Sequence, residues 1–150
     1  MRAIEELKYQ YAAYCDSGYD LEGLRSIFIE GLRSIFIPDG RWIANGFGAF
    51  TGHEEICRFF AELTTTVVQV LHYVTGPRIV VADDGQRAAG RFYLLCLSKS
   101  RRREDPSVVD SVATLGTYED QFVKREGRWL FEEMKVNVAR AFKIPPFHQA

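Results

Sequence analysis

The sequence predicts an α+β fold in which one curved, mostly antiparallel sheet wraps a helix. Three observations support this prediction: the 150-residue length, helical periodicity in the first part of the chain, and a β-type composition in the remainder. A second domain would need roughly 50 residues of its own, so we expect one domain over residues 1–150. With 47% hydrophobic and 26% charged residues, that domain can bury a complete core.

Three segments have the pattern of amphipathic helices. In residues 3–15, apolar side chains recur at steps of three and four. A second helix is expected from about Asp20 to the stop at Pro38-Asp39-Gly40. A third is expected over residues 53–63, where the helix dipole favours the two glutamates of the first turn.

The second helix contains a direct tandem duplication. Residues 22–29 and residues 30–37 both read EGLRSIFI. Eight residues advance an α-helix about 80° beyond two full turns, so the apolar side chains of the two copies cannot face one groove equally well. We interpret the duplication as an insertion, natural or engineered, with one copy partly exposed, looped out or used in an intermolecular contact.

Residues with high β-propensity dominate the chain after residue 67. Short strands are expected at residues 41–44 and 49–52, before and after a glycine-containing loop. The longer strands are expected at residues 67–74, 78–82, 87–98, 112–124 and 128–138. Hairpin turns at Asp83-Asp84-Gly85 and Glu126-Gly127 indicate antiparallel neighbours, which completes the α+β prediction.

Charge and cysteine usage exclude several classes of protein. The net charge is −1, so no basic field is available for nucleic acid, and we expect no nucleic-acid partner. No apolar run approaches the roughly 18 residues that span a bilayer, which predicts a cytoplasmic protein with no membrane partner. Cys15, Cys57 and Cys96 are odd in number and widely spaced, and the histidines are scattered, so we expect reduced thiols and no metal site.

Three side chains are candidates for chemistry, each with a structural alternative. His72 lies inside the apolar strand 67–74, where an imidazole is either hydrogen-bonded structure or a general base. Tyr11 lies on the apolar stripe of the first helix, so its hydroxyl must find a partner or face a cavity. Asp16 follows that stripe and by itself has the pattern of a turn residue.

Two further segments suggest interactions. Residues 91–97 are apolar on both faces of the expected strand, so the outer face of the sheet needs cover, and we expect a homo-oligomer, a dimer or trimer. Arg101-Arg102-Arg103, followed by two acidic residues, is interpreted as a solvated hairpin loop, with an anion site as the alternative.

Several segments together resemble the SnoaL-like branch of the nuclear transport factor 2-like superfamily. They are AIEELKYQYAAYCD, FGAFTGHEEICRFF, LHYVTGPRIVV, GRFYLLCLS and YEDQFVKREGRWLFEEMKV. The resemblance covers residues 3 to about 138 and implies a cone-shaped, cystatin-like sheet around the N-terminal helices. Within the superfamily the pattern is most similar to the bile acid 7α-dehydratases, and more distantly to hexachlorocyclohexane dehydrochlorinases and scytalone dehydratases.

This resemblance implies a site and a reaction. In the first two of these families an aspartate at the end of the first helix pairs with a strand histidine, and these positions match Asp16 and His72; the helix tyrosine of the dehydratases matches Tyr11. The implied activity is a cofactor-free lyase, dehydratase-like, acting on a small hydrophobic cyclic molecule such as a steroid. The residues expected to line its pocket are Trp42, Phe60, Phe92, Cys96, Tyr118 and Asn137.

Two alternatives remain open at this point. A double-bond isomerase, like the ketosteroid isomerases of the same superfamily, would use the same base but return the proton elsewhere. A non-catalytic binding or assembly subunit would instead keep His72 as a satisfied core residue. For that class, we expect Asp16 to point to solvent and side chains to fill the cone.

Overall fold

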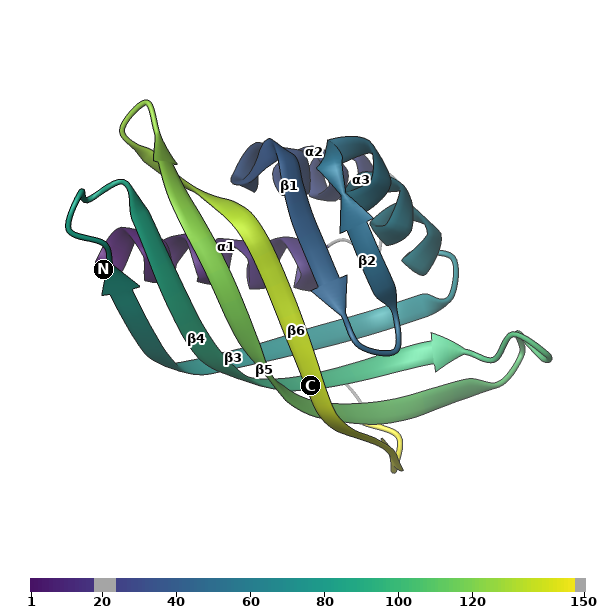
Figure 1. Ribbon diagram of the computed structural model, residues 1–150. Helices are drawn as coiled ribbons and strands as arrows, with labels where there is room; N and C mark the ends of the chain where they lie inside the picture. Colours follow the sequence, from purple (N-terminus) through teal and green to yellow (C-terminus); the bar gives the residue numbers. More distant parts are fainter. Residues whose placement is uncertain (18–23, 148–150) are drawn as a thin grey trace.

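The computed structural model describes residues 1–17 and 24–147, and within them three helices lie on one face of a curved sheet (Figure 1). The helices are α1 (Arg2–Ser17), α2 (Leu24–Ile35) and α3 (Gly52–Leu63). Helices gathered on one side of a largely antiparallel sheet form an α+β fold, so the predicted fold class is confirmed.

The sheet has six strands in the order β2-β1-β6-β5-β4-β3. Their bounds are β1 Phe36–Ala44, β2 Gly48–Thr51, β3 Val67–Val81, β4 Arg87–Arg101, β5 Val109–Arg125 and β6 Arg128–Ile144. Neighbours pair antiparallel except β1 and β6, which pair parallel. The long strands β3 to β6 curve beneath the helices and form the floor of the molecule (Figure 1).

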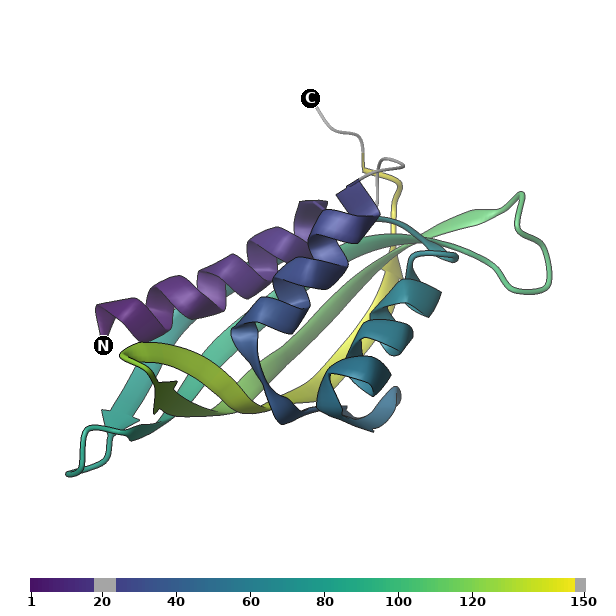
Figure 2. The same ribbon diagram turned by 90° about the horizontal axis from the view of Figure 1, so that it is seen from above.

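Helix α1 forms where the periodicity predicts it and buries the predicted stripe. Its buried residues are Ile4, Leu7, Lys8, Tyr11, Ala12 and Cys15. The helix packs against β3 and α2 (Figure 2), which brings its last turn beside the middle of β3. The position of a buried side chain along α1 therefore determines which part of the sheet it contacts.

The duplicated segment adopts two conformations. Phe28 and Ile29 of the first copy are helical, but the same dipeptide in the second copy, Phe36-Ile37, belongs to β1, where Phe36 pairs with Phe131 of β6. The expected helix up to Pro38 is therefore too long, since pairing with β6 overrides helical periodicity at its end. Its expected start at Asp20 lies outside the described residues.

One face of α2 is built from both copies. Phe28 of the first copy and Leu32 and Ile35 of the second are all buried in the core. Gly31 lies where a Cβ atom would come within 2.8 Å of the Tyr14 ring of α1, so a glycine lets the two helices approach closely. In the described part of α2, the second copy thus supplies core residues and a close helix contact.

Strand β3 replaces two predicted strands. The expected strands at 67–74 and 78–82 are one element, with a register shift against β4 between Thr75 and Arg78. Gly76 has φ +63° at this shift and packs against the Tyr93 ring. A positive φ favours glycine, so the bend that interrupts the periodicity is a bulge in a continuous strand.

The outer face of the sheet exposes large apolar side chains, as the pattern of residues 91–97 suggests. They include Tyr73, Tyr93, Leu95, Leu115 and Phe142. Burying such a face in a homo-oligomer stays a prediction. Within the described ranges, none of the helices is long and apolar enough to cross a membrane.

Candidate active site

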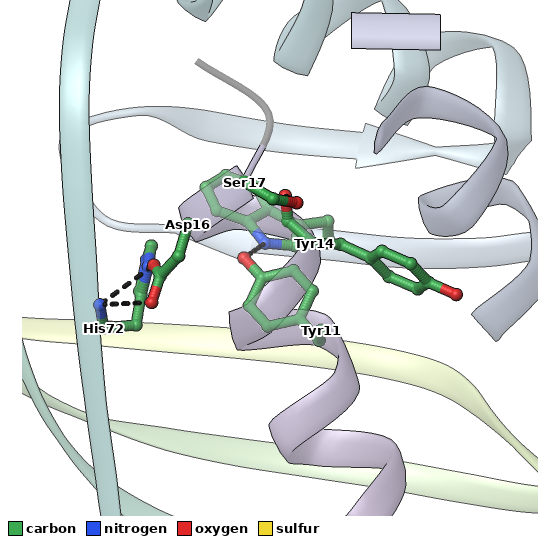
Figure 3. Close-up of polar contacts among 6 residues, drawn as sticks. Tyr11, Tyr14, Asp16, Ser17 and His72 are labelled. Atoms are coloured by element: carbon green, nitrogen blue, oxygen red, sulfur yellow. Dashed lines mark hydrogen bonds and ion pairs between the residues drawn. The ribbon is translucent and has the colours of Figure 1, made fainter. Parts of the chain in front are cut away.

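The end of α1 is joined to β3 through Asp16 and His72 (Figure 3). The Oδ1 atom of Asp16 lies 2.6 Å from Nδ1 of the imidazole. The backbone N–H of His72 also donates to the same carboxylate, at 3.0 Å to Oδ1 and 3.2 Å to Oδ2. Because a carboxylate accepts, Nδ1 carries the proton, and Nε2 of the neutral ring is the atom able to accept another proton.

The environment of His72 favours its protonated form. Burial lowers the pKa of the imidazole, but the hydrogen bonds that the ring makes with the side chains of Asp16 and Cys96 outweigh burial and raise the pKa to about 9. Cys96 is the cross-strand partner of His72 on β4, which places the thiol and the ring side by side. At neutral pH the ring of the free protein is thus mostly an imidazolium held by Asp16.

Tyr11 lies on the buried stripe of α1, five residues before Asp16. The indole N–H of Trp42 donates to its hydroxyl at 3.2 Å. Its ring makes edge contacts with His72 and Tyr118, with centroids 6.4 Å and 6.1 Å apart. Burial raises the pKa of Tyr11 well above its usual value, so the hydroxyl keeps its proton and remains a donor.

A cavity of about 380 Å³ opens beside these residues. Tyr11 and His72 line it, and so do four of the six predicted lining residues: Trp42, Phe60, Cys96 and Tyr118. Side chains therefore do not fill the cone, and Asp16 is bonded to His72, in contrast to what we expect of a non-catalytic subunit. No group of three or more His, Cys, Asp or Glu residues that could hold a metal ion occurs in the described part of the chain.

Two predicted lining residues lie elsewhere. Phe92 is fully buried in the closed core, where its ring lies 5.5 Å from the ammonium of Lys8, rather than at the cavity wall. Asn137 lines a groove on the outer face with Tyr73 and Tyr93. Its neighbours Val136 and Val138 do line the cavity. Because successive strand residues point to opposite faces of a sheet, Asn137 points to the outer face.

The structure contains a second charged pair that sequence analysis missed. The Nζ atom of Lys8 lies 2.9 Å from Oδ2 of Asp120, and both side chains are fully buried. The same ammonium lies 3.0 Å from the centroid of the Tyr118 ring, the side chain between it and the cavity. Lys8 falls four residues after Ile4 and three before Tyr11, so its place on the apolar stripe is the signal that would have identified it.

Burial also controls the protonation of this pair. It lowers the pKa of Lys8 to about 8 and raises the pKa of Asp120 to about 6, each opposed by the charge of the partner. Both groups remain charged at neutral pH. The pair lies beneath the cavity floor and does not line it.

Comparison with solved structures supports the fold of this site. A hexachlorocyclohexane dehydrochlorinase (LinA) type 2 superposes with a TM-score of 0.80 at 19% identity, covering 99% of this chain and 91% of that chain. A scytalone dehydratase-like protein from Novosphingobium aromaticivorans gives 0.76 at 21% identity, covering 98% and 89%. A protein with a cystatin-like fold from Nostoc punctiforme gives 0.69 at 18% identity, covering 91% and 89%.

No curated protein matches the chain. The family model for the SnoaL-like domain, in contrast, matches residues 1–135, which include α1, α2, α3 and most of the sheet. This match confirms the predicted resemblance. The chain belongs to the SnoaL-like domain family.

Proposed function

We propose that the protein is a cofactor-free lyase that eliminates water, or another small leaving group, from a hydrophobic cyclic substrate, with Asp16 and His72 as its base. The observation that carries this proposal is the 2.6 Å contact from Asp16 to Nδ1 of a histidine that lines an open cavity. Membership in the SnoaL-like family and structural likeness to a dehydrochlorinase and a scytalone dehydratase-like protein support the same class of reaction.

Each of the three residues has a defined part in this reaction. Neutral His72 accepts through Nε2 a proton from the carbon next to an activating carbonyl, and Asp16 stabilises the imidazolium that forms. The electron pair of the broken C–H bond becomes the new double bond as the hydroxyl group leaves. The proton held by His72 then passes to the departing hydroxide, which completes one molecule of water and restores the base.

Tyr11 stabilises the charge that develops on the substrate. Its hydroxyl accepts from Trp42 and keeps its own proton, so it donates to the leaving group or to the enolate oxygen. Aromatic and aliphatic side chains surround it, as an apolar ring system requires. A cavity of about 380 Å³ lies within the usual range of roughly 300–1,000 Å³ for small-molecule sites.

The test is a screen of hydroxylated cyclic ketones, beginning with hydroxysteroids, against the wild-type protein and a His72→Asn variant. Elimination is detected as loss of the mass of water from the product and as absorbance of a conjugated double bond. We expect His72→Asn to lower the rate by on the order of 10²- to 10⁴-fold.

His53→Asn is the matched control, because His53 is also partly buried but bonds the backbone oxygen of Phe36 through Nε2 at 2.8 Å, away from the cavity. It should retain wild-type turnover. Undiminished turnover in His72→Asn would refute the base assignment. A product of unchanged mass with a shifted double bond would favour the isomerase over the lyase.

A further inference from the structure

The cavity has two chemically different ends. One end is aromatic and holds Tyr11, Trp42 and Phe60. The other is formed by the end of β4, the residues that follow it and the turn after α3, where polar and charged residues line the cavity: Thr66, Ser98, Ser100, Arg101 and Arg103. A purely apolar ligand would leave this polar end without a partner.

The polar end of the cavity lies at the opposite end from His72, the proposed base. Cys96 pairs with His72, and Arg101 follows five residues later on β4, about 16 Å along the strand. The backbone N–H of Arg101 donates to the oxygen of Thr66 at 2.8 Å, which fixes the end of β4 against the turn after α3. Beyond it, the β4–β5 hairpin extends past α3 into solvent (Figure 2).

The three consecutive arginines of this hairpin have different partners. Arg102 forms a two-point contact with Asp110, at 2.7 Å and 2.9 Å, and Lys143 also reaches this carboxylate. Arg101 and Arg103 have no ion pair within 4.0 Å among the residues that the structure describes. The middle arginine thus anchors the loop, and its two neighbours are exposed at the cavity mouth.

Charges around the mouth are predominantly positive on the cavity side. Of the other carboxylates in the loop, Asp105 accepts from the backbone and hydroxyl of Ser107. Glu104 is exposed and interacts electrostatically with Arg102 rather than lining the cavity. The described residues that line the cavity include no aspartate or glutamate. An anionic group entering the mouth would therefore meet two guanidinium groups, the side chains best suited to a planar oxyanion.

We propose that the ligand of this cavity is an amphipathic anion, whose apolar ring body packs against Tyr11, Trp42 and Phe60 while a carboxylate or another oxyanion is held at the mouth by Arg101 and Arg103. This proposal rests on the proposed function, which places the reacting end of the ligand beside His72. Anion binding itself requires no turnover, so the two can fail separately. The separation of the two ends places the anion at the opposite end of the ligand from the reacting carbon.

Two dyes of the same ring skeleton provide the test. Anilinonaphthalene sulfonate carries an anionic group, whereas phenylnaphthylamine lacks it, and both fluoresce in apolar sites. We expect the wild-type protein to bind the sulfonate more tightly than the neutral dye. Added sodium chloride should weaken binding of the sulfonate but not binding of the neutral dye. In the variant Arg101→Gln/Arg103→Gln we expect the dissociation constant of the sulfonate to be about tenfold larger than in the wild type. The dissociation constant of the neutral dye should change by less than twofold.

Arg125→Gln/Arg128→Gln is the matched control. It removes the same charge from the turn between β5 and β6, where these residues pair with each other at the opposite end of the sheet (Figure 1). It should leave both dissociation constants within twofold of wild type. Val70→Trp, which adds an indole at the cavity wall, should abolish binding of both dyes if they occupy the cavity rather than the outer groove.

Each outcome decides the proposal. The proposal is supported if the preference for the sulfonate over the neutral dye is lost only in the Arg101/Arg103 variant. It is overturned if that preference is unchanged there, if the control variant lowers it equally, or if sulfonate binding survives Val70→Trp. Selective sulfonate binding together with a failed elimination assay would retain the anion site and reject the lyase.

Discussion

Two charged pairs join α1 to the sheet, and they differ in what surrounds them. Lys8 meets Asp120 of β5 where both side chains are 0% exposed. Asp16 meets His72 of β3 where the side chains are 27% and 12% exposed and an open cavity adjoins the ring. The first pair has no route to a ligand, whereas the second can exchange a proton with one. The same helix thus supplies a structural ion pair in its middle and a chemical pair at its end.

The largest expected effect comes from breaking the sealed pair. Asp120→Asn leaves the Lys8 ammonium buried without its counter-charge, which we expect to lower the free energy of unfolding by about 3–5 kcal/mol. Urea denaturation monitored by circular dichroism measures this change. The double variant Lys8→Met/Asp120→Leu should recover most of the loss, because apolar residues remove both buried charges together.

A neighbouring carboxylate provides the control for this experiment. Glu119 precedes Asp120 on β5 but faces solvent, 3.8 Å from Lys135. Glu119→Gln should leave the unfolding midpoint unchanged. A loss in Asp120→Asn no greater than in Glu119→Gln would mean that the sealed pair contributes nothing to stability.

The next-largest effect is the dependence of stability on pH, which differs between the two pairs. The pKa of His72 in the folded protein, about 9, lies above its ordinary value of 6.5, so the folded protein binds this proton more tightly than the unfolded chain. The resulting stabilisation is fully present below pH 6.5 and is lost as the pH rises through 9. Between pH 6.5 and 8 we expect the His72 contribution to the free energy of unfolding to fall by roughly 2 kcal/mol.

The difference between wild type and His72→Asn isolates this contribution, since Lys8 begins to titrate near pH 8 in the folded protein with the opposite sign. Turnover should change in the other direction. Only neutral His72 accepts a proton, so kcat/KM of the free enzyme should rise with pH up to about 9. A difference in stability that does not vary with pH would contradict the raised pKa.

The two pairs also show what the sequence can predict. Helix α1 and its stripe follow from periodicity, because burial repeats every few residues along a helix. Asp16 and His72 are 56 residues apart, and no rule of spacing joins them; the resemblance to a family suggested the pair. Lys8 lay on the predicted stripe, but its charge concealed its burial, and its partner is 112 positions away.

The duplicated octapeptide marks another limit of local reasoning. Its Phe-Ile dipeptide is helical at residues 28–29 and extended at residues 36–37, so the local sequence does not determine the conformation. Pairing of Phe36 with Phe131 of β6 decides it. Similarly, Phe92 and Asn137 are predicted to line the pocket but lie elsewhere, because the face of the sheet to which a strand residue points depends on the register of the sheet.

The smallest expected effect on stability comes from Asp16→Asn, and its value lies in separating structure from chemistry. The asparagine oxygen can still accept from the backbone N–H of His72, which the carboxylate now binds at 3.0 Å, so the end of α1 stays attached to β3. At about pH 10, where His72 is neutral in both proteins, we expect the free energy of unfolding to fall by only about 1 kcal/mol. The pKa of His72, followed by NMR titration of the ring, should fall toward 6.5, because the strongest contribution that raises it is removed. Asp110→Asn, at the partly buried contact with Arg102, should leave this titration unchanged. If the pKa of His72 stays near 9 in Asp16→Asn, the neighbouring thiol of Cys96, rather than Asp16, controls the ring, and the pair at the end of α1 is structural like the pair in its middle.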